Sequence, residues 1–365
     1  MGPQHDPWDP ILTAGWSDRP LLTSIEVTVT LQCNLRCDHC AVGEVLVGRD
    51  VRAISLDRLI ERLDEVDTLV TFSLTGGEPA ASPQVVREVV RPLLAYAKSR
   101  GLRTQVNTNL TLPFDRYESF AELVDVMHIS YNAIDPETFA RIVYAKAEHL
   151  PVRPEALFER LEENVRRLCA AGCFVSAETI LSDWTMERID AIHARIAELG
   201  CRRHEIHPLY PSDYAASMRL PTLEELARAT RRLLSRRDPD VWILFGTFPF
   251  FACSPEREHR ELLLEVLSTP NTTVRNDPDG RCRLNVSSLT GEVLLQDFAD
   301  LGPLGNIEEE SFLDIWERWL SSERAARLHC ACPQARCLGP NLIVADVYFP
   351  GVSWRGRRAL VGVEA

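Results

Sequence analysis

Three cysteines stand within eight residues in the stretch LQCNLRCDHC, at Cys33, Cys37 and Cys40. A closed structural zinc site needs four ligands, and His39 offers a fourth donor here. Because His39 and Cys40 are adjacent, their side chains do not usually reach one ion together. A cubane iron–sulfur cluster instead takes one thiolate per iron. Three cysteines therefore favour a [4Fe–4S] cluster whose fourth iron is open to another ligand.

Glycine and polar residues follow apolar segments further along the chain. TGGEP contains Gly76, Gly77 and Glu78, and its glycines allow another group to approach the backbone closely. Asn109 in NTNL and Ser130 in ISYN end similar segments. Taken alone, TGGEP is also an ordinary strand-to-helix turn, and Asn109 and Ser130 are also plain polar residues at strand ends.

A second group of cysteines lies near the C-terminus, in the pattern Cys330-x-Cys332-x4-Cys337, with Cys282 upstream. Four cysteines at such spacings suit an iron–sulfur cluster, and they also suit structural zinc. Cys253 lies in the apolar segment FPFFACSPE. It is a candidate hydrogen donor, cluster ligand or buried core thiol, and its apolar surroundings favour the core thiol.

The elements that must position these residues alternate along the first half of the chain. Short apolar segments predict strands at 25–30, 69–74, 103–110, 126–133, 174–181 and 203–210, and amphipathic segments between them predict helices that include 55–66, 82–101, 156–172 and 186–200. Such alternation is typical of βαβ units and a parallel sheet. Six units are fewer than the eight of a closed barrel, so the sequence predicts an α/β fold with a partial (β/α)6 barrel.

Past Pro211 the pattern changes. A helix is expected at 222–237, an apolar irregular segment at 241–256, a tight turn at 276–280, a hairpin about Gly291 and a helix at 311–328. We predict four regions: a barrel with an N-terminal extension at 1–215, a helical and irregular connector at 216–275, a small cysteine domain at 276–345 and a tail at 346–365.

The cysteine loop after a first strand, followed by TGGEP, resembles the signature of the radical SAM enzymes, and the resemblance covers residues 25–210. It implies a [4Fe–4S] cluster on Cys33, Cys37 and Cys40, whose open iron chelates S-adenosylmethionine (SAM). Reductive cleavage of SAM then gives a 5′-deoxyadenosyl radical that abstracts a hydrogen atom from a substrate.

The same resemblance assigns SAM contacts along the barrel strands: Gly76, Gly77, Glu78, Asn109, Ser130, Glu178 and the backbone near Leu209. Two positions depart from the usual pattern. Leu110 stands where the family has glycine after Asn109, and His39 stands where many members have an aromatic residue.

The C-terminal cysteines resemble the SPASM or twitch extensions of radical SAM proteins, and most closely the subgroup with a CxCxxxxC motif, the YfkAB type. A full SPASM domain has a cysteine five residues after its glycine, whereas Gly291 is followed there by Gln296. The resemblance therefore implies one auxiliary [4Fe–4S] cluster, held by Cys282, Cys330, Cys332 and Cys337.

Composition limits the partners and the compartment. The 365 residues carry a net charge of −13, which argues against nucleic acid and anionic membrane as partners. There is no apolar run of 18 residues, and the acidic N-terminus lacks the features of a signal peptide. Eleven cysteines without an export signal indicate a reducing compartment, so we expect a cytoplasmic protein.

These features predict an oxidoreductase that uses SAM, with a flavodoxin or ferredoxin as its reducing partner. The resemblance to SPASM enzymes favours a ribosomally made peptide or protein as substrate. A small molecule, such as a sugar or amino-acid derivative, is the alternative. Two rivals are an iron–sulfur redox protein without catalysis and a zinc-stabilised binding module.

Overall fold

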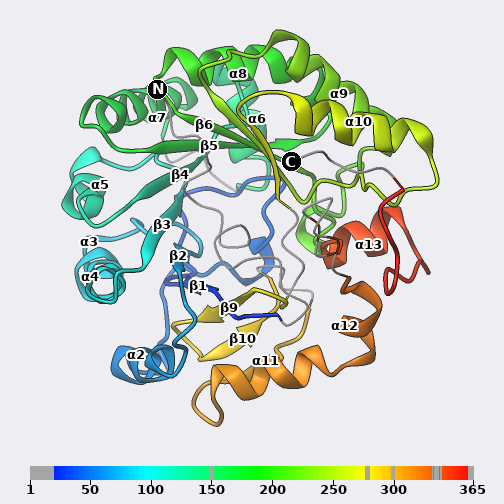
Figure 1. The fold of residues 1–365 in the computed structure, drawn as a ribbon. Coiled ribbons are helices and arrows are strands. Elements are labelled where there is room, and N and C mark those ends of the chain that lie inside the picture. The colour runs from blue at the N-terminus through cyan, green and yellow to red at the C-terminus, as the bar shows by residue number, and fades with distance from the viewer. Residues whose placement is uncertain are drawn as a thin grey trace.

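The computed structural model describes residues 20–147, 152–275, 280–296, 301–330, 332, 337 and 339–360. The acidic N-terminus, which is expected not to be a signal peptide, and most of the expected turn at 276–280 lie outside these residues. Eleven strands in the described part of the chain form one sheet, in the order β11-β10-β9-β1-β2-β3-β4-β5-β6-β7-β8. The sheet curls around a central space and the helices cover its outer side (Figure 1).

The strands from β1 to β8 run parallel to one another in chain order. Their bounds are β1 Ser24–Thr28, β2 Thr71–Thr75, β3 Arg103–Thr108, β4 Val126–Ser130, β5 Val175–Leu181, β6 Arg203–Pro208, β7 Trp242–Gly246 and β8 Thr272–Arg275. The expected six strands and the partial-barrel fold are confirmed. β7 and β8 extend the sheet beyond them, and β7 lies within the segment that was expected to be irregular.

The predicted hairpin about Gly291 joins the opposite edge of the same sheet. β9 (Arg283–Ser287) pairs in parallel with β1, and β10 (Glu292–Leu294) and β11 (Gly305–Asn306) follow in antiparallel pairing. Gly291 has a φ of +77°, which glycine adopts without strain. A Cβ there would lie 2.6 Å from Asn306 Oδ1. The small C-terminal region therefore shares its sheet with the barrel.

Helices follow most strands, and several of them begin after a Ser, Thr, Asp or Asn residue whose side chain caps the first turn. They are α2 Leu56–Asp64, α3 Pro83–Val85, α4 Arg91–Ser99, α5 Phe114–Ala121, α6 Pro136–Val143, α7 Pro154–Ala170, α8 Ile189–Glu198, α9 Leu223–Arg236, α10 Arg257–Ser268, α11 Phe312–Leu320, α12 Glu323–Leu328 and α13 Leu342–Tyr348. Thr222 and Glu225 form a capping box at the start of α9. The expected helix 311–328 is two helices, because Ser322 caps a new one. The expected helix 82–101 contains a π-helical turn, η2 (Val86–Val90).

Alternation along the strands separates two environments. In β1, Ile25 and Val27 are buried in the main apolar core, whereas Glu26 and Thr28 line the interior space. The same period of two recurs in the other strands. The core therefore lies between sheet and helices, and the inside of the barrel is polar.

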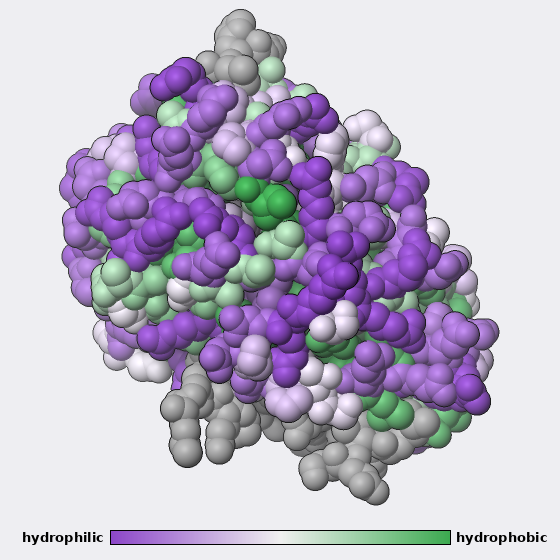
Figure 2. Space-filling model, turned by 90° about the horizontal axis from the view of Figure 1, so that it is seen from above, coloured by the Kyte–Doolittle hydropathy of each residue, from purple (hydrophilic) through white to green (hydrophobic). Residues whose placement is uncertain are grey.

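The surface carries no broad apolar face in the view of Figure 2, where hydrophilic side chains predominate and hydrophobic ones form small separate groups. Such scattered apolar residues are ordinary for a protein surface. None of the helices in the described ranges has the length and apolar character needed to cross a membrane.

Candidate active site

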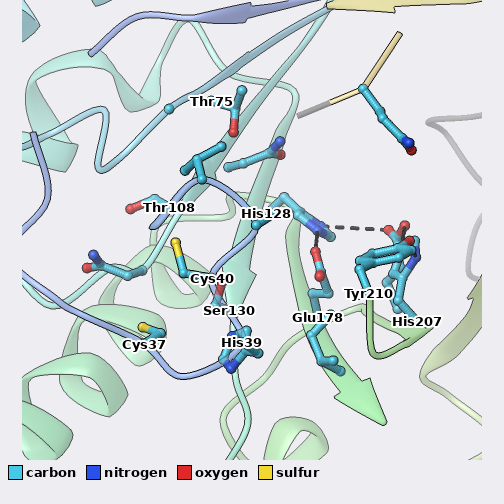
Figure 3. A pocket seen from close by; sticks show the side chains of 18 of the residues that line it. Cys37, His39, Cys40, Thr75, Thr108, His128, Ser130, Glu178, His207 and Tyr210 are labelled. Atoms are coloured by element: carbon cyan, nitrogen blue, oxygen red, sulfur yellow. Dashed lines mark hydrogen bonds and ion pairs between the residues drawn. The ribbon is translucent and has the colours of Figure 1, made fainter. Parts of the chain in front are cut away.

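A cavity of about 350 Å³ occupies the inside of the barrel (Figure 3). It is lined by residues from every strand from β1 to β9, and β2 contributes its last residue, Thr75. Its walls include residues with polar or thiol side chains: Glu26, Cys33, Cys37, His39, Cys40, Thr75, Gln105, Asn107, Asn109, His128, Ser130, Asn132, Glu178, Glu205, His207, Tyr210, Thr247, Arg275, Arg283, Asn285, Gln296 and Asn341. The carboxyl ends of parallel strands are the usual place for an active site in barrels.

All three cysteines of the first loop line this cavity. The loop is docked on α6, since the Arg36 and Asp38 N–H groups donate to the Val143 and Ile142 carbonyls at 3.0 and 2.9 Å. The Leu35 N–H donates to Cys33 Sγ at 3.4 Å. The three cysteines therefore face one cavity, and their shared role as cluster ligands stays a prediction.

The electrostatics of the loop suit a bound cation. Burial raises the pKa of Cys33 to about 12, and the neighbouring Glu78 and Cys40 add to that shift. Burial also raises the pKa of Cys37, with further contributions from Cys40 and Cys33. Three thiolates so close to one another need a positive partner, and iron supplies it.

Among the described residues, no three Cys, His, Asp or Glu side chains converge as ligands of a single metal ion would. A cubane does not require such convergence, because each thiolate binds a different iron. The donor set of the loop fits a [4Fe–4S] cluster held by Cys33, Cys37 and Cys40.

The two glycines of TGGEP line the cavity and pack against the chain that enters the cysteine loop. A Cβ on Gly76 would lie 2.3 Å from the Thr30 carbonyl oxygen, and one on Gly77 would lie 2.2 Å from that of Gln32. Gly76 also has a φ of +143°. The Gly77 N–H donates to the Thr30 carbonyl at 2.8 Å. The glycines are therefore needed for close approach of two backbones.

Glu78 is buried and is not among the residues that line the cavity. Its carboxylate accepts from the N–H groups of Ala80 and Asn109, at 3.0 and 2.8 Å, and from the Thr108 hydroxyl at 2.8 Å. Burial raises its pKa to about 7. The sequence prediction gave Glu78 a direct ligand contact, whereas the structure places it behind Asn109, where it holds the end of β3.

Asn109 lines the cavity beside the cysteine loop. Its side-chain amide donates to Asn34 Oδ1 at 3.1 Å and points at Cys33 Sγ from 3.8 Å. Leu110, which follows it, has a φ of +54° although it is not glycine. The backbone there takes the conformation that glycine would favour.

Ser130 at the end of β4 is the register partner of Glu178 in the middle of β5, and both line the cavity. Glu178 Oε2 lies 2.6 Å from His128 Nε2 (Figure 3). Burial opposes ionisation of Glu178, but this hydrogen bond and the nearby His207 bring its pKa below the usual range. Leu209 is buried outside the cavity wall, and its N–H donates to the Leu181 carbonyl at 3.2 Å; the next residue, Tyr210, lines the cavity.

A buried network of titratable and charged side chains in the cavity wall was not predicted; it consists of His128, Glu205, His207 and Arg275 and is called the cavity floor below. Glu205 on β6 accepts from Arg275 Nη2 at 2.6 Å and lies 2.8 Å from His207 Nε2 and 3.7 Å from His128 Nδ1. Burial opposes ionisation of Glu205, but Arg275 and the histidines hold its pKa well below the usual range. His207 Nδ1 lies 2.6 Å from Thr247 Oγ1.

A second polar group joins the two halves of the chain at β1 and β9. Glu26 accepts from Ser73 Oγ at 2.7 Å and Asn107 Nδ2 at 2.8 Å, and it forms an ion pair with Arg283. Alternating polar residues, such as Arg203, Glu205 and His207 in RHEIHP, were the sequence signal for this interior.

The C-terminal cysteines are brought together in part. Cys332 and Cys337 exchange two backbone hydrogen bonds, at 2.8 and 3.2 Å, and Cys330 is buried just after α12. Cys282 precedes β9, and its carbonyl accepts from the Thr23 and Ser24 N–H groups. Residues 331, 333–336 and 338 lie outside the described part of the chain.

Comparison with solved structures shows the fold that the chain shares. SuiB of Streptococcus suis, bound to its precursor peptide SuiA, gives a TM-score of 0.59 at 15% identity, over 84% of this chain and 66% of that chain. A structure titled anSMEcpe with bound AdoMet and the Cp18Cys peptide gives 0.56 at 15% identity, over 82% and 80%. The chain thus spans about two thirds of the length of SuiB.

Comparison of sequences shows the family. The protein YfkA of Bacillus subtilis is 44% identical over 360 residues, which are 98% of this chain and 96% of YfkA. GTP 3′,8-cyclase of Microcystis aeruginosa is 28% identical over 33% of this chain and 37% of its own. Residues 27–196 match the radical SAM superfamily and residues 209–359 match the YfkB-like domain. The chain therefore belongs to the radical SAM superfamily, in the family of YfkA with its YfkB-like C-terminal domain.

Proposed function

We propose that this radical SAM protein abstracts a hydrogen atom from a substrate bound in the barrel cavity. The observation that carries the proposal is that the thiols of Cys33, Cys37 and Cys40 open on the same cavity as the charged floor of the barrel. A cluster and a substrate would then face one another across a single cavity.

When bound at the loop, a [4Fe–4S] cluster and SAM would supply a 5′-deoxyadenosyl radical. The chain would hold SAM through the backbone at Gly76 and Gly77 and through the side chains of Asn109, Ser130 and Glu178, which all line the cavity. Glu78 would act through Asn109, because its carboxylate accepts a hydrogen bond from the Asn109 N–H group.

The substrate would lie over the floor formed by His128, Glu205, His207 and Arg275. We propose a ribosomally made peptide or protein, and the likeness in fold to SuiB and anSMEcpe, which are titled with peptides, supports this. The second candidate is a small polar molecule, favoured by the many hydrogen-bonding groups that face the cavity.

The cluster would need an outside electron donor, for which we propose a flavodoxin or ferredoxin. A compartment that keeps thiols reduced is required for eleven free cysteines. We therefore propose that the protein acts in the cytoplasm.

The test is formation of 5′-deoxyadenosine by the anaerobically reconstituted protein with SAM and dithionite. Cys37→Ala should abolish the product, because two thiolates cannot hold the cluster in place. Cys173→Ala removes a half-buried thiol near a helix end and should leave product formation unchanged. Equal product from wild type and Cys37→Ala would overturn the proposal.

The same assay separates the two substrate classes when fractions of a cell extract are added. Stimulation that is lost after protease treatment supports a peptide or protein substrate. Stimulation by a protease-resistant fraction of low molecular mass supports a small molecule instead.

A further inference from the structure

Cys253 lies beside the C-terminal cysteines although it is about 80 residues upstream of them. After β7, Thr247 takes a positive φ of +51° and the chain turns into the segment that carries Cys253. Cys253 and Cys337 both pack against one small apolar cluster, formed by Phe251, Val344 and Trp354. The fold thus brings a fifth cysteine to a group that the sequence pattern alone presented as four.

The geometry of Cys332 and Cys337 suits a shared inorganic ligand. Their two reciprocal backbone hydrogen bonds make them directly opposed residues of an antiparallel pair. Side chains of such a pair point to the same face. Both thiols are therefore presented on one side of the bridge.

Cys337 also resembles the first cluster loop in how its sulfur is bonded. The Gly339 N–H donates to Cys337 Sγ at 3.4 Å, and the Leu35 N–H donates to Cys33 Sγ at the same distance. In both places the donor is two residues after the cysteine. Hydrogen bonds from backbone N–H groups to cysteine sulfurs are one means by which proteins tune iron–sulfur clusters.

The charges around the thiols agree with this placement. Arg281, Arg357 and Arg358 lie close enough to Cys330 to interact with its thiol electrostatically. Arg357 also interacts with Cys253. A group of thiols beside several arginines suits a cluster with net negative charge.

We infer that Cys253 is a ligand of an auxiliary iron–sulfur cluster, together with Cys330, Cys332 and Cys337. This inference rests on the proposed function, since it adds a ligand to the second cluster of that enzyme. It gives Cys253 the place that the sequence prediction gave to Cys282. The four thiols are enough to close a cubane, because each of the four irons takes one.

The test uses a variant without the cysteines of the first loop, so that the iron bound by the second cluster can be measured alone. A chain with Cys33, Cys37 and Cys40 all changed to Ala should bind about four iron and four sulfide per chain after anaerobic reconstitution. Adding Cys253→Ala should reduce both to nearly none. Adding Cys173→Ala instead is the matched control, and it should leave both unchanged.

Retention of about four iron after Cys253→Ala would overturn the inference. It would also be overturned if the C-terminal site bound zinc instead of iron and Cys253→Ala reduced the zinc content. To exclude a folding defect, the Cys253→Ala and Cys173→Ala chains should have the same far-UV circular dichroism before reconstitution. If the triple variant binds no iron while the wild type binds about four and cleaves SAM, the inference about the second cluster is wrong and the proposed function still stands. If the wild type binds no iron, both the inference and the proposed function are wrong.

Discussion

Glu78 illustrates how a residue can belong to a ligand motif without lining the ligand cavity. The glycines before it face the cavity, but its own carboxylate is turned into the protein toward Thr108 and the Asn109 N–H. A buried carboxylate with several donors fixes the backbone that carries them. Its contribution to SAM binding would therefore be indirect, through the position of Asn109.

Burial of Glu78 predicts a dependence of stability on pH. Its pKa rises from 4.5 in the unfolded chain to about 7 in the folded one. The folded state therefore binds the proton more tightly, and this contribution to stability is complete below about pH 4.5 and lost as the pH rises to about 7. The shift corresponds to about 3 kcal/mol.

Glu78→Gln removes the titrating group and should remove this part of the pH dependence. We expect the difference in unfolding temperature between wild type and variant to change progressively between about pH 5 and pH 7 and then to level off. Anaerobic thermal unfolding at several pH values measures it. A constant difference across this range would show that Glu78 titrates near its ordinary pKa.

Residue types and spacing predicted the thiols and several cavity residues, but they did not predict the charged floor. Cys33, Cys37 and Cys40 could be identified as candidate ligands from the sequence, because three thiolates in one short loop have few structural explanations. Glu205 and His207 occupy alternate strand positions, where polar residues usually face solvent. Because the sheet curls into a partial barrel, the face that carries these residues points into the interior. The alternating pattern of one strand does not show that the sheet curls.

At the scale of elements, the strand-to-helix turn after β2 and the cysteine loop after β1 form one unit. Gly77 donates to Thr30, and the Glu78 N–H donates to the Gln32 carbonyl, each at 2.8 Å. The loop that we predict to hold the first cluster is thereby hydrogen-bonded, just before Cys33, to the residues that follow β2.

Gly77→Ala should loosen this unit, since its Cβ would lie 2.2 Å from the Gln32 carbonyl oxygen. Overpacking of this kind costs about 1–3 kcal/mol. We expect formation of 5′-deoxyadenosine to fall by about tenfold, the equivalent of about 1.4 kcal/mol.

Gly48→Ala is the matched control, because nothing lies within 4 Å of a Cβ at that position of the same loop. It should retain activity within about twofold of wild type. Equal activity of the two variants would mean that the turn and the loop can separate without harm to the site.

Elements with a clear apolar period were predicted, and those without one were not. β1 to β6 and α9 follow from their patterns, with ends shifted by a few residues. β7 was hidden in a long apolar run that contains Pro249 and many aromatic residues. β8 has four residues, TTVR, too few to show a period. Their place in the sheet comes from pairing with β6 and with each other, which is a long-range property.

At the scale of the whole molecule, the two halves of the chain share one sheet and one core. β9 pairs along the full length of β1, from Ser24 with Arg283 to Thr28 with Ser287. The main apolar cluster contains Leu284, Phe312 and Trp316 as well as residues of the first five strands. The expected boundary near residue 215 is therefore crossed by pairing on both edges of the barrel.

This continuity predicts that residues 1–211 do not fold alone. Removing β7 and β9 would leave β6 and β1 as bare edges and would expose the apolar faces they cover, which favours aggregation. We expect the fragment to be insoluble or rapidly digested by protease, and co-expression with residues 212–365 to restore soluble protein if the two pieces can pair. A soluble 1–211 fragment with cooperative thermal unfolding and about four bound iron would contradict this, because the barrel would then hold its first cluster without the sheet that the C-terminal half completes.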